Sequence, residues 1–283
     1  VPAVNQPVTV SVRAQDPQAV SSCEVWWSAN GAAFAHAAMS PQVPGVYSGT
    51  IPGFAAGTLV QFYVRATDGL GAASTWPAKS TNAGALYEVN DGQANLNNGH
   101  NFRVLLSPAN WALLRAATNL MSSAFLPGTL IYDEQRAYYE VGIRLKGSQS
   151  GRVGSPTTSP PSFHIEFQPD DLFRGVHPNL LLDTSGPPGL DNQQEEILVY
   201  HLANHAGGIP NVTPDMCRVI PPYQTNSSAG LAVPRFEDEF IETAFPNGGA
   251  GQLWQFELTY YPTSTNSAGY KLPSPQAFWS TDI

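Results

Sequence analysis

The stretch that decides the fold of the larger part of this chain is YEVGIRLKGSQSGR, residues Tyr139–Arg152. Up to Lys146, apolar side chains alternate with small or charged ones, a pattern that predicts a β-strand with one buried face. The face expected to be buried holds Val141, Ile143 and Leu145, and the opposite face holds Gly142, Arg144 and Lys146.

A glycine- and serine-rich loop follows this strand directly. Its backbone N–H groups and hydroxyls, next to a lysine, are the groups from which proteins build a cradle for an anion such as phosphate. The candidate phosphate-binding residues are Arg144, Lys146, Gly147, Ser148, Ser150 and Gly151. A hairpin turn with solvated charges explains the same residues without a ligand, because glycine and serine are common in turns.

The composition limits the class of partner. With 283 residues the chain is long enough for two domains, each with its own core. Its formal net charge is −9 and it holds 13 Lys and Arg residues, too few for the basic surface that neutralises nucleic-acid phosphates. We therefore expect no nucleic-acid partner.

The same composition indicates where the protein works. Only 12% of the residues are charged, while Gly and Pro contribute 25 each, which is typical of a β-rich secreted or cell-surface protein. No apolar run approaches the roughly 20 residues that cross a bilayer, so we expect no membrane span. The chain begins at Val1 without a signal peptide, and we expect a processed piece whose export signal lies upstream.

Two cysteines lie far apart in the sequence. Cys23 alternates in phase with Val25 and Trp27, which predicts a buried thiol on a strand. A disulfide from Cys23 to Cys217 in an oxidising compartment is the alternative.

Residues 1–90 are predicted to form an all-β sandwich. Turn signals separate the strand candidates, which are Val8–Ala14, Cys23–Ser28, Tyr47–Pro52, Leu59–Thr67 and Ala85–Val89. Residues 7–80 closely resemble the fibronectin-III/Ig-like modules of large bacterial secreted proteins, which implies a spacer or adhesive unit. Four of its aromatic residues either pack on the sheets or form a sugar-stacking surface, namely Trp26, Trp27, Tyr63 and Trp76. Residues 91–101 are polar and turn-forming, as expected of a linker.

Residues 102–283 are predicted to form an α+β domain. The strand candidates are Phe102–Leu106, Tyr138–Lys146, Ser162–Phe167, Asn179–Leu182, Met216–Ile220 and Gly230–Val233. We expect the second and third of these to pair across the Gly/Ser loop. Helices are expected after Ser107-Pro108, where serine is a good N-cap, and over Gln193–Ala206 and Phe236–Phe245.

Several blocks of this second domain resemble, in order, the spore coat protein H (CotH) kinase-like family. These blocks are VGIRLKGSQS at Val141–Ser150, PSFHIEF at Pro161–Phe167, Asn179–Leu182, EEILVY at Glu195–Tyr200, and Gly230–Phe240 followed by Gln252–Trp254. The resemblance implies the N-terminal part of an atypical protein kinase that phosphorylates extracellular or coat proteins. It also implies that the Gly/Ser loop covers the phosphates of ATP, held with Mg²⁺ or Mn²⁺, and that Glu196 is the helix glutamate that pairs with a lysine.

The sequence departs from the family at the positions where cations are needed. The family strand "FKIKF" is here Phe163–Phe167, with His164 and Glu166 in place of both lysines. A carboxylate about 4 Å from a phosphate costs roughly 4 kcal/mol per charge pair at an effective dielectric near 20. Lys146 on the neighbouring strand is the remaining candidate for the phosphate-binding lysine. After Trp254 a convincing catalytic loop is missing, so the kinase-like domain is expected to be incomplete and this segment alone to transfer no phosphate.

Metal sites have weaker support in the sequence. His201 and His205 share a helix face but lack the glutamate of an HExxH motif. Oxygen ligands for Ca²⁺ are available at Asp170-Asp171 and at Asp183 or Asp191, at spacings that fit no EF-hand. We assign no metal ligand and no catalytic residue.

Three functions stay open on the sequence. The first is a secreted CotH-like protein with a degenerate or truncated kinase-like domain, acting as a coat, matrix or surface component. The second is an active atypical kinase of extracellular proteins whose catalytic lobe lies outside this segment. The third is a secreted protein that binds or degrades polysaccharide, with the sandwich as its binding module.

Overall fold

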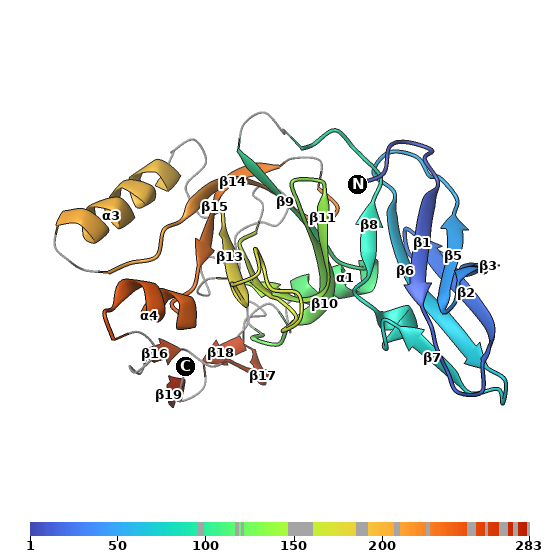
Figure 1. Ribbon diagram of the computed structural model, residues 1–283. Helices are drawn as coiled ribbons and strands as arrows, with labels where there is room; N and C mark the ends of the chain where they lie inside the picture. The colour runs from blue at the N-terminus through green and yellow to red at the C-terminus, as the bar shows by residue number, and fades with distance from the viewer. Residues whose placement is uncertain are drawn as a thin grey trace.

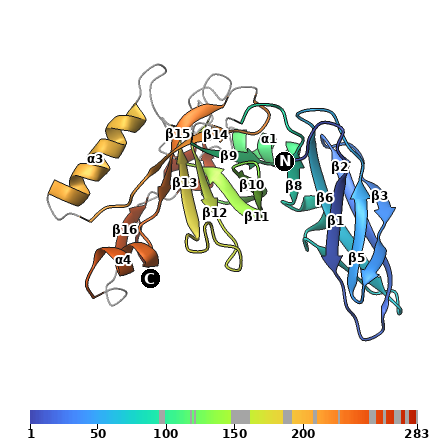
Figure 2. The ribbon, with the colours of Figure 1, turned by 45° about the horizontal axis from the view of Figure 1, so that its top comes forward.

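The structure is a computed structural model that describes residues 1–94, 99–116, 119, 122–146, 161–184, 192–206, 210–224 and 227–247. Side chains are described in these ranges except at 192, 193 and 238. Beyond residue 250 the backbone of four strands is described, paired as β16 (Leu253–Glu257) with β19 (Ala277–Thr281) and β17 (Tyr260–Thr265) with β18 (Lys271–Pro273). In Figures 1 and 2 an N-terminal two-sheet unit lies beside a barrel, with one helix standing on the far side.

Two antiparallel sheets make up the N-terminal unit. The first has the order β1-β5-β4, with β1 (Val8–Arg13), β5 (Val46–Ile51) and β4 (Ser40–Val43). The second has the order β3-β2-β6-β7, with β3 (Ala35–Ala38), β2 (Val20–Ala29), β6 (Leu59–Asp68) and β7 (Ala73–Trp76). A further strand, β8 (Leu86–Glu88), pairs with the start of β6, and the short 3-10 helix η1 (Ser80–Asn82) precedes it.

The core of this unit lies between the two sheets. Alternate residues of neighbouring strands meet there, including Val25, Ile51, Val60 and Val64, all at most 2% exposed. Cys23 belongs to the same core, as predicted, and its Sγ lies 3.6 Å from the sulfur of Met39. A two-layer core of this kind is how antiparallel sheets bury their apolar faces. The assignment to fibronectin-III/Ig-like modules stays a prediction.

A closed barrel of seven strands forms the centre of the second half. Its order is β10-β11-β12-β13-β15-β14-β9, and every pair is antiparallel except β14 with β9. The strands are β9 (His100–Leu105), β10 (Leu126–Tyr132), β11 (Arg136–Leu145), β12 (Phe163–Glu166), β13 (Asn179–Asp183), β14 (Asp215–Ile220) and β15 (Ser228–Pro234). The predicted pairing across the Gly/Ser loop is confirmed, with Leu145 opposite Phe163 and Gly142 opposite Glu166.

The barrel interior is apolar. Val141, Ile143 and Leu145 of β11 are at most 4% exposed and belong to this core, together with Phe102, Val219 and others from the remaining strands. The predicted division of β11 into a buried and an outer face is therefore confirmed. Cys217 is also part of this interior and, like Cys23, is a free buried thiol, so the alternative of a disulfide between them is not realised.

Within the described residues, three α-helices lie around the barrel. α1 (Pro108–Arg115) begins as predicted, because the side chain of Ser107 accepts a hydrogen bond from the backbone N–H of Asn110. α3 (Asn192–Ala206) stands at the far side of the barrel and packs against β15, and α4 (Asp238–Ala244) lies below it in Figure 1. Strands thus outweigh helices in this domain, and its assignment to an α+β, kinase-like class stays a prediction.

The sandwich and the barrel meet over a continuous interface. Leu59 and Leu86 of the sandwich share one apolar cluster with Leu105 and Ile131 of the barrel. Beside it, the guanidinium of Arg103 is 1% exposed and bonds the carboxylates of Glu88, Asp91 and Glu134. The predicted linker 91–101 therefore has both ends in ordered contacts, since Asp91 binds Arg103 and β9 begins at His100. The proposed boundaries at residues 90 and 102 stay predictions.

Within the described residues, no helix is both long and apolar enough to cross a membrane.

Candidate functional site

The outer face of β11, β12 and β13 carries the predicted site. The ladder places Arg144 opposite His164, and His164 opposite Leu181 of β13. At the end of this row the backbone N–H of Lys146 donates to the carbonyl of Ser162 over 2.9 Å. Residues two positions apart along a strand share one face. Lys146 lies two after Arg144, Ser162 two before His164 and Asp183 two after Leu181, so the three come together on the outside of the barrel.

Lys146 forms an ion pair with Asp183. Its ammonium donates to Oδ2 of Asp183, while the hydroxyl of Ser162 donates to Oδ1 of the same carboxylate over 3.1 Å. The Asp183 side chain is 9% exposed and that of Lys146 is 28% exposed. Ser162 in turn accepts from the backbone N–H of Thr184 over 2.9 Å. The lysine that the sequence offered for a phosphate is therefore held by a nearly buried carboxylate.

Glu196 of α3 interacts electrostatically with this pair. Burial raises the pKa of its carboxyl above the usual range, the negative charge of Asp183 raises it further, and Lys146 acts in the opposite direction. Tyr200, one turn later on the same helix, also has a raised pKa, because of burial first and then of Glu196 and Asp183. Lys146 therefore pairs directly with Asp183 and acts on Glu196 only through longer-range electrostatics, so the implied Lys146–Glu196 pair stays a prediction.

Arg144 belongs to a different set of contacts. Its guanidinium lies over the ring of Phe125, 5.2 Å from the centroid, and the Phe125 ring also meets His164 edge-on. His164 is 5% exposed, and its Nε2 lies 2.9 Å from Oδ1 of Asn179. Glu166, at the second family lysine position, is exposed. Neither of these positions therefore supplies a fixed cation next to Lys146.

Four of the predicted phosphate-binding residues cannot be placed. Gly147, Ser148, Ser150 and Gly151 lie outside the described residues. Sequence reasoning missed Asp183 and Ser162 as the partners of Lys146, although Asp183 was considered as a Ca²⁺ ligand. The order and spacing of the three predicted strands could have revealed this cluster. Antiparallel pairing brings the end of one strand opposite the start of the next, and so brings Lys146 to Ser162.

The described residues do not fit the triphosphate of ATP. Lys146 is paired with Asp183, and the Glu196 carboxyl interacts electrostatically with both, so the formal charge of this group is negative when all three are ionised. A triphosphate would have to displace Asp183 from Lys146 and then lie beside its charge.

The two histidines of α3 make no described metal site. Their rings stack at 4.0 Å, and Nδ1 of His205 lies 2.8 Å from the carbonyl of His201. Among the described residues no three His, Cys, Asp or Glu side chains converge as metal ligands.

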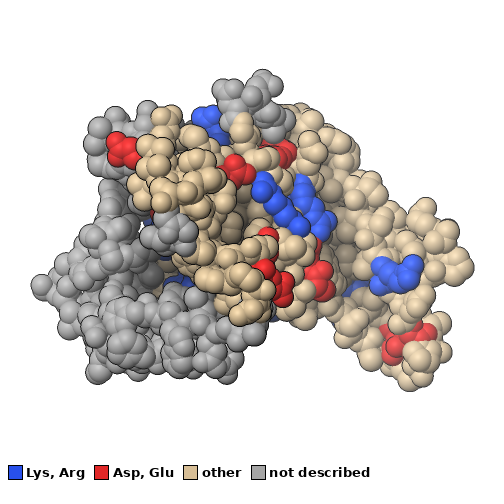
Figure 3. Space-filling view, turned by 60° about the vertical axis from the view of Figure 1, so that its left-hand side comes forward, with Lys and Arg blue, Asp and Glu red and all other residues tan. Residues whose placement is uncertain are grey.

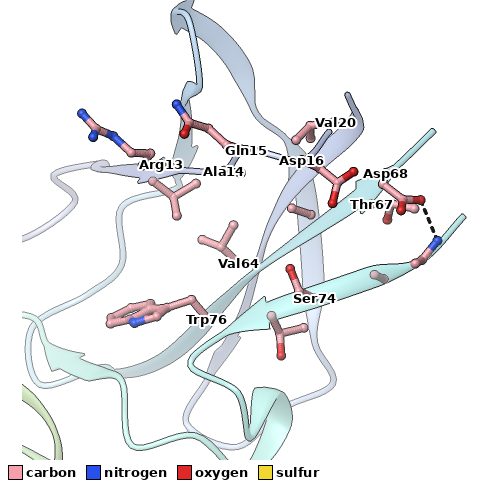
Figure 4. A pocket seen from close by; sticks show the side chains of 15 residues that line it. Arg13, Ala14, Gln15, Asp16, Val20, Val64, Thr67, Asp68, Ser74 and Trp76 are labelled. Carbon is pink, nitrogen blue, oxygen red and sulfur yellow. Dashed lines mark hydrogen bonds between the residues drawn. The ribbon is translucent and has the colours of Figure 1, made fainter. Parts of the chain in front are cut away.

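Two hollows open elsewhere on the surface. One, of about 420 Å³, lies against α4, where Arg174 bonds Asp215 over 3.3 Å and His177 bonds Glu239 over 2.7 Å. The other, of about 340 Å³, lies on the sandwich and is drawn in Figure 4. On the face seen in Figure 3, basic and acidic groups lie next to one another without a continuous basic patch.

The aromatic residues of the sandwich serve different purposes. Trp26 stacks on His36 at 4.2 Å and on Tyr63 at 5.8 Å, so parallel rings lie on both of its faces. Trp27 packs against the sandwich core. Trp76, by contrast, is 47% exposed and lines the hollow of Figure 4. Of the four aromatic residues considered for sugar stacking, Trp76 is the one that lines this hollow.

Comparisons with known proteins give no family. No family model matches the chain, and no curated protein matches it. Among solved structures, an uncharacterised Listeria monocytogenes protein crystallised with glucose, magnesium and calcium is similar over 65% of this chain and 15% of that one, at 8% identity and a TM-score of 0.24. The twitchin kinase region of C. elegans is similar over 83% of this chain and 38% of that one, at 9% identity and a TM-score of 0.24. The chain spans less than half of either structure, and scores of this size carry no inference about activity.

Proposed function

We propose that this chain is a secreted or surface protein, a coat or matrix component, whose barrel domain is a degenerate kinase-like module that does not transfer phosphate. The single observation that carries this proposal is the ion pair between Lys146 and Asp183. The cation that a kinase keeps for the nucleotide is here paired with a carboxylate at the end of β13, on the same face of the barrel. The partners of such a protein are other extracellular or surface proteins.

The electrostatics of the group support this assignment. Glu196 is the acid that the family resemblance pairs with the lysine, yet Asp183 takes the direct bond and adds its own charge next to Glu196. Removing the charge of Asp183 without changing its shape frees Lys146 to meet an anion. The proposal therefore predicts that Asp183→Asn gains affinity for inorganic phosphate and for ATP, whereas the wild type has little.

The experiment is a transfer assay with ATP labelled on its γ-phosphate. The full 283-residue chain is incubated with Mg²⁺ or Mn²⁺ and a general acceptor protein, beside the Lys146→Ala variant. The proposal expects equal, background-level transfer from both. Robust transfer by the wild type that Lys146→Ala abolishes would refute it.

A second function, an active atypical kinase, has one specific observation in its favour. The charge of Lys146 acts to lower the pKa of the Glu196 carboxyl, so the lysine and the glutamate that the resemblance pairs are coupled electrostatically, without a direct ion pair among the described residues. On this alternative Asp183 releases Lys146 when ATP binds with its metal ion. ATP binding by the wild type in calorimetry, lost in Glu196→Gln as well as in Lys146→Ala, would favour it.

A further inference from the structure

The hollow of Figure 4 is a groove along the open side of the sandwich. It lies between β1 and β7, which are the outermost strands of the two sheets, so no strand of the described chain covers it. Val64 and Ala66 of β6 lie at its floor, where the sandwich core reaches the surface. Its volume of about 340 Å³ is within the range of roughly 300–1,000 Å³ that small-molecule sites occupy.

Trp76 forms one end of the groove. Its ring meets Tyr139 of the barrel at 5.9 Å and 90° and Phe62 at 6.4 Å and 45°, so it is fixed from behind by contacts that are not parallel stacks. Trp26 of the same domain differs, because it is stacked on both faces. An exposed indole held in this way can place a face against an apolar ligand surface at little entropic cost.

The walls of the groove carry polar side chains, and several of these have no hydrogen-bond partner among the described residues. The side chains of Gln15 and Arg13 on one wall and of Ser74 on the other make no hydrogen bond or ion pair with the described residues. Asp16 and Asp68 each use Oδ1 to accept backbone N–H groups of the following turn, which fixes both carboxylates in place. In Figure 4 these acids lie at the end of the groove away from Trp76. Donors and acceptors thus line a groove with one aromatic end.

We propose that this groove binds a neutral oligosaccharide. A sugar ring has an apolar face of C–H groups and a rim of hydroxyls, and these match Trp76 and the amide, hydroxyl and carboxylate groups of Gln15, Ser74 and Asp16. A polyanionic glycan would bring its charges against Asp16 and Asp68, with Arg13 as the one cation among the lining residues. The site is separate from the Lys146 group and does not depend on the function proposed for it.

The test is retention of the whole chain on insoluble cellulose, chitin, xylan and mannan, followed by titration with the soluble oligosaccharide of the polymer that retains it. Trp76→Ala is expected to lower the affinity about tenfold or more. Trp26→Ala is the matched control in the same domain and is expected to bind like the wild type, because neither face of Trp26 is open.

A second variant protects the test against misfolding. Ser74 is exposed, so Ser74→Arg fills the groove without touching the contacts of Trp76 with Phe62 and Tyr139, and it is expected to abolish retention. Retention on none of the four polymers, or equal retention of the wild type, Trp76→Ala and Ser74→Arg, would overturn the proposal. So would binding of an extended peptide that Ser74→Arg blocks while no glycan is retained, since that would make the groove a site for strand addition.

Discussion

Two groups in this molecule each combine one cation with nearby carboxylates, but one group is buried and the other is partly exposed to solvent. At the junction of sandwich and barrel, Arg103 faces three carboxylates and is 1% exposed. On the outer face of the barrel, Lys146 pairs with Asp183, interacts with Glu196 only through longer-range electrostatics, and is 28% exposed. The first group is closed to solvent and the second is within reach of a ligand.

The hydrogen bonds show why the first group is structural. Arg103 binds Asp91 through both terminal nitrogens, at 2.8 and 3.0 Å, and Glu134 through Nε and Nη2, at 2.9 and 3.0 Å. Glu88 accepts from Nη1 over 2.5 Å. All the donor directions of the planar guanidinium are thereby used, which an ammonium cannot achieve. Lys146 has a single carboxylate in direct contact, and that contact can be exchanged.

The largest effect is expected from Arg103→Ala. It leaves three partly or fully buried carboxylates without their cation, and removing one partner of a buried ion pair costs about 3–5 kcal/mol of unfolding free energy. Urea denaturation of the whole chain measures this loss. Because the group joins sandwich to barrel, the unfolding transition is also expected to split into two steps.

Arg136→Ala is the matched control for this prediction. Arg136 is paired with Asp171 but its side chain is 59% exposed, so its removal is expected to change stability by at most about 1 kcal/mol. Equal losses of unfolding free energy in Arg103→Ala and Arg136→Ala would contradict the claim that the buried ion pairs of Arg103 contribute more to stability than the exposed pair of Arg136.

A smaller loss of unfolding free energy is expected from Lys146→Met. Methionine keeps the aliphatic stem, and Asp183 keeps its bond from Ser162, so we expect about 1–2 kcal/mol, between the values for buried and exposed pairs. Thermal or urea unfolding measures the loss. Lys79→Met, at an exposed position, is the control and is expected to be neutral. A loss as large as that of Arg103→Ala would mean that the Lys146 group is structural too.

The smallest effect is a pH-dependent one at Glu196. Its pKa is raised in the folded protein, so at neutral pH its ionised form is disfavoured there, and Glu196→Gln is expected to raise the melting temperature slightly. As the pH falls through the raised pKa, the folded wild type takes up the proton first and regains stability. The advantage of the Gln variant is therefore lost toward the ordinary carboxyl range. A difference that is constant with pH, or one shared by Glu195→Gln, would contradict this account.

The sequence predicts local structure better than it predicts partners. The alternation of Val141 to Lys146, the pairing of this strand with the one at Phe163 and the Ser107 cap each depend on neighbouring residues, and each is confirmed. Strand β10 (Leu126–Tyr132) was missed because LPGTLIY contains a proline and a glycine near its start, which are uncommon within strands.

Long-range contacts explain the other omissions. The barrel closes through the parallel pair β14–β9, which joins segments far apart in the chain and has no local signal. The partners of Arg103 come from two domains, and the pairing of Lys146 with Asp183 depends on the order of three strands. The types of residue at the candidate site were therefore predictable from the sequence. The pairing of Lys146 with Asp183 was not.

The most direct test of the central claim is calorimetric titration of ATP, with Mg²⁺ present, into the wild-type chain and into Asp183→Asn. If Asp183 occupies Lys146, the wild type gives no binding heat and the Asn variant gains binding that Lys146→Ala removes. Tight ATP binding by the wild type, unchanged or weakened in Asp183→Asn, would contradict the claim that this ion pair keeps the barrel from acting on nucleotides.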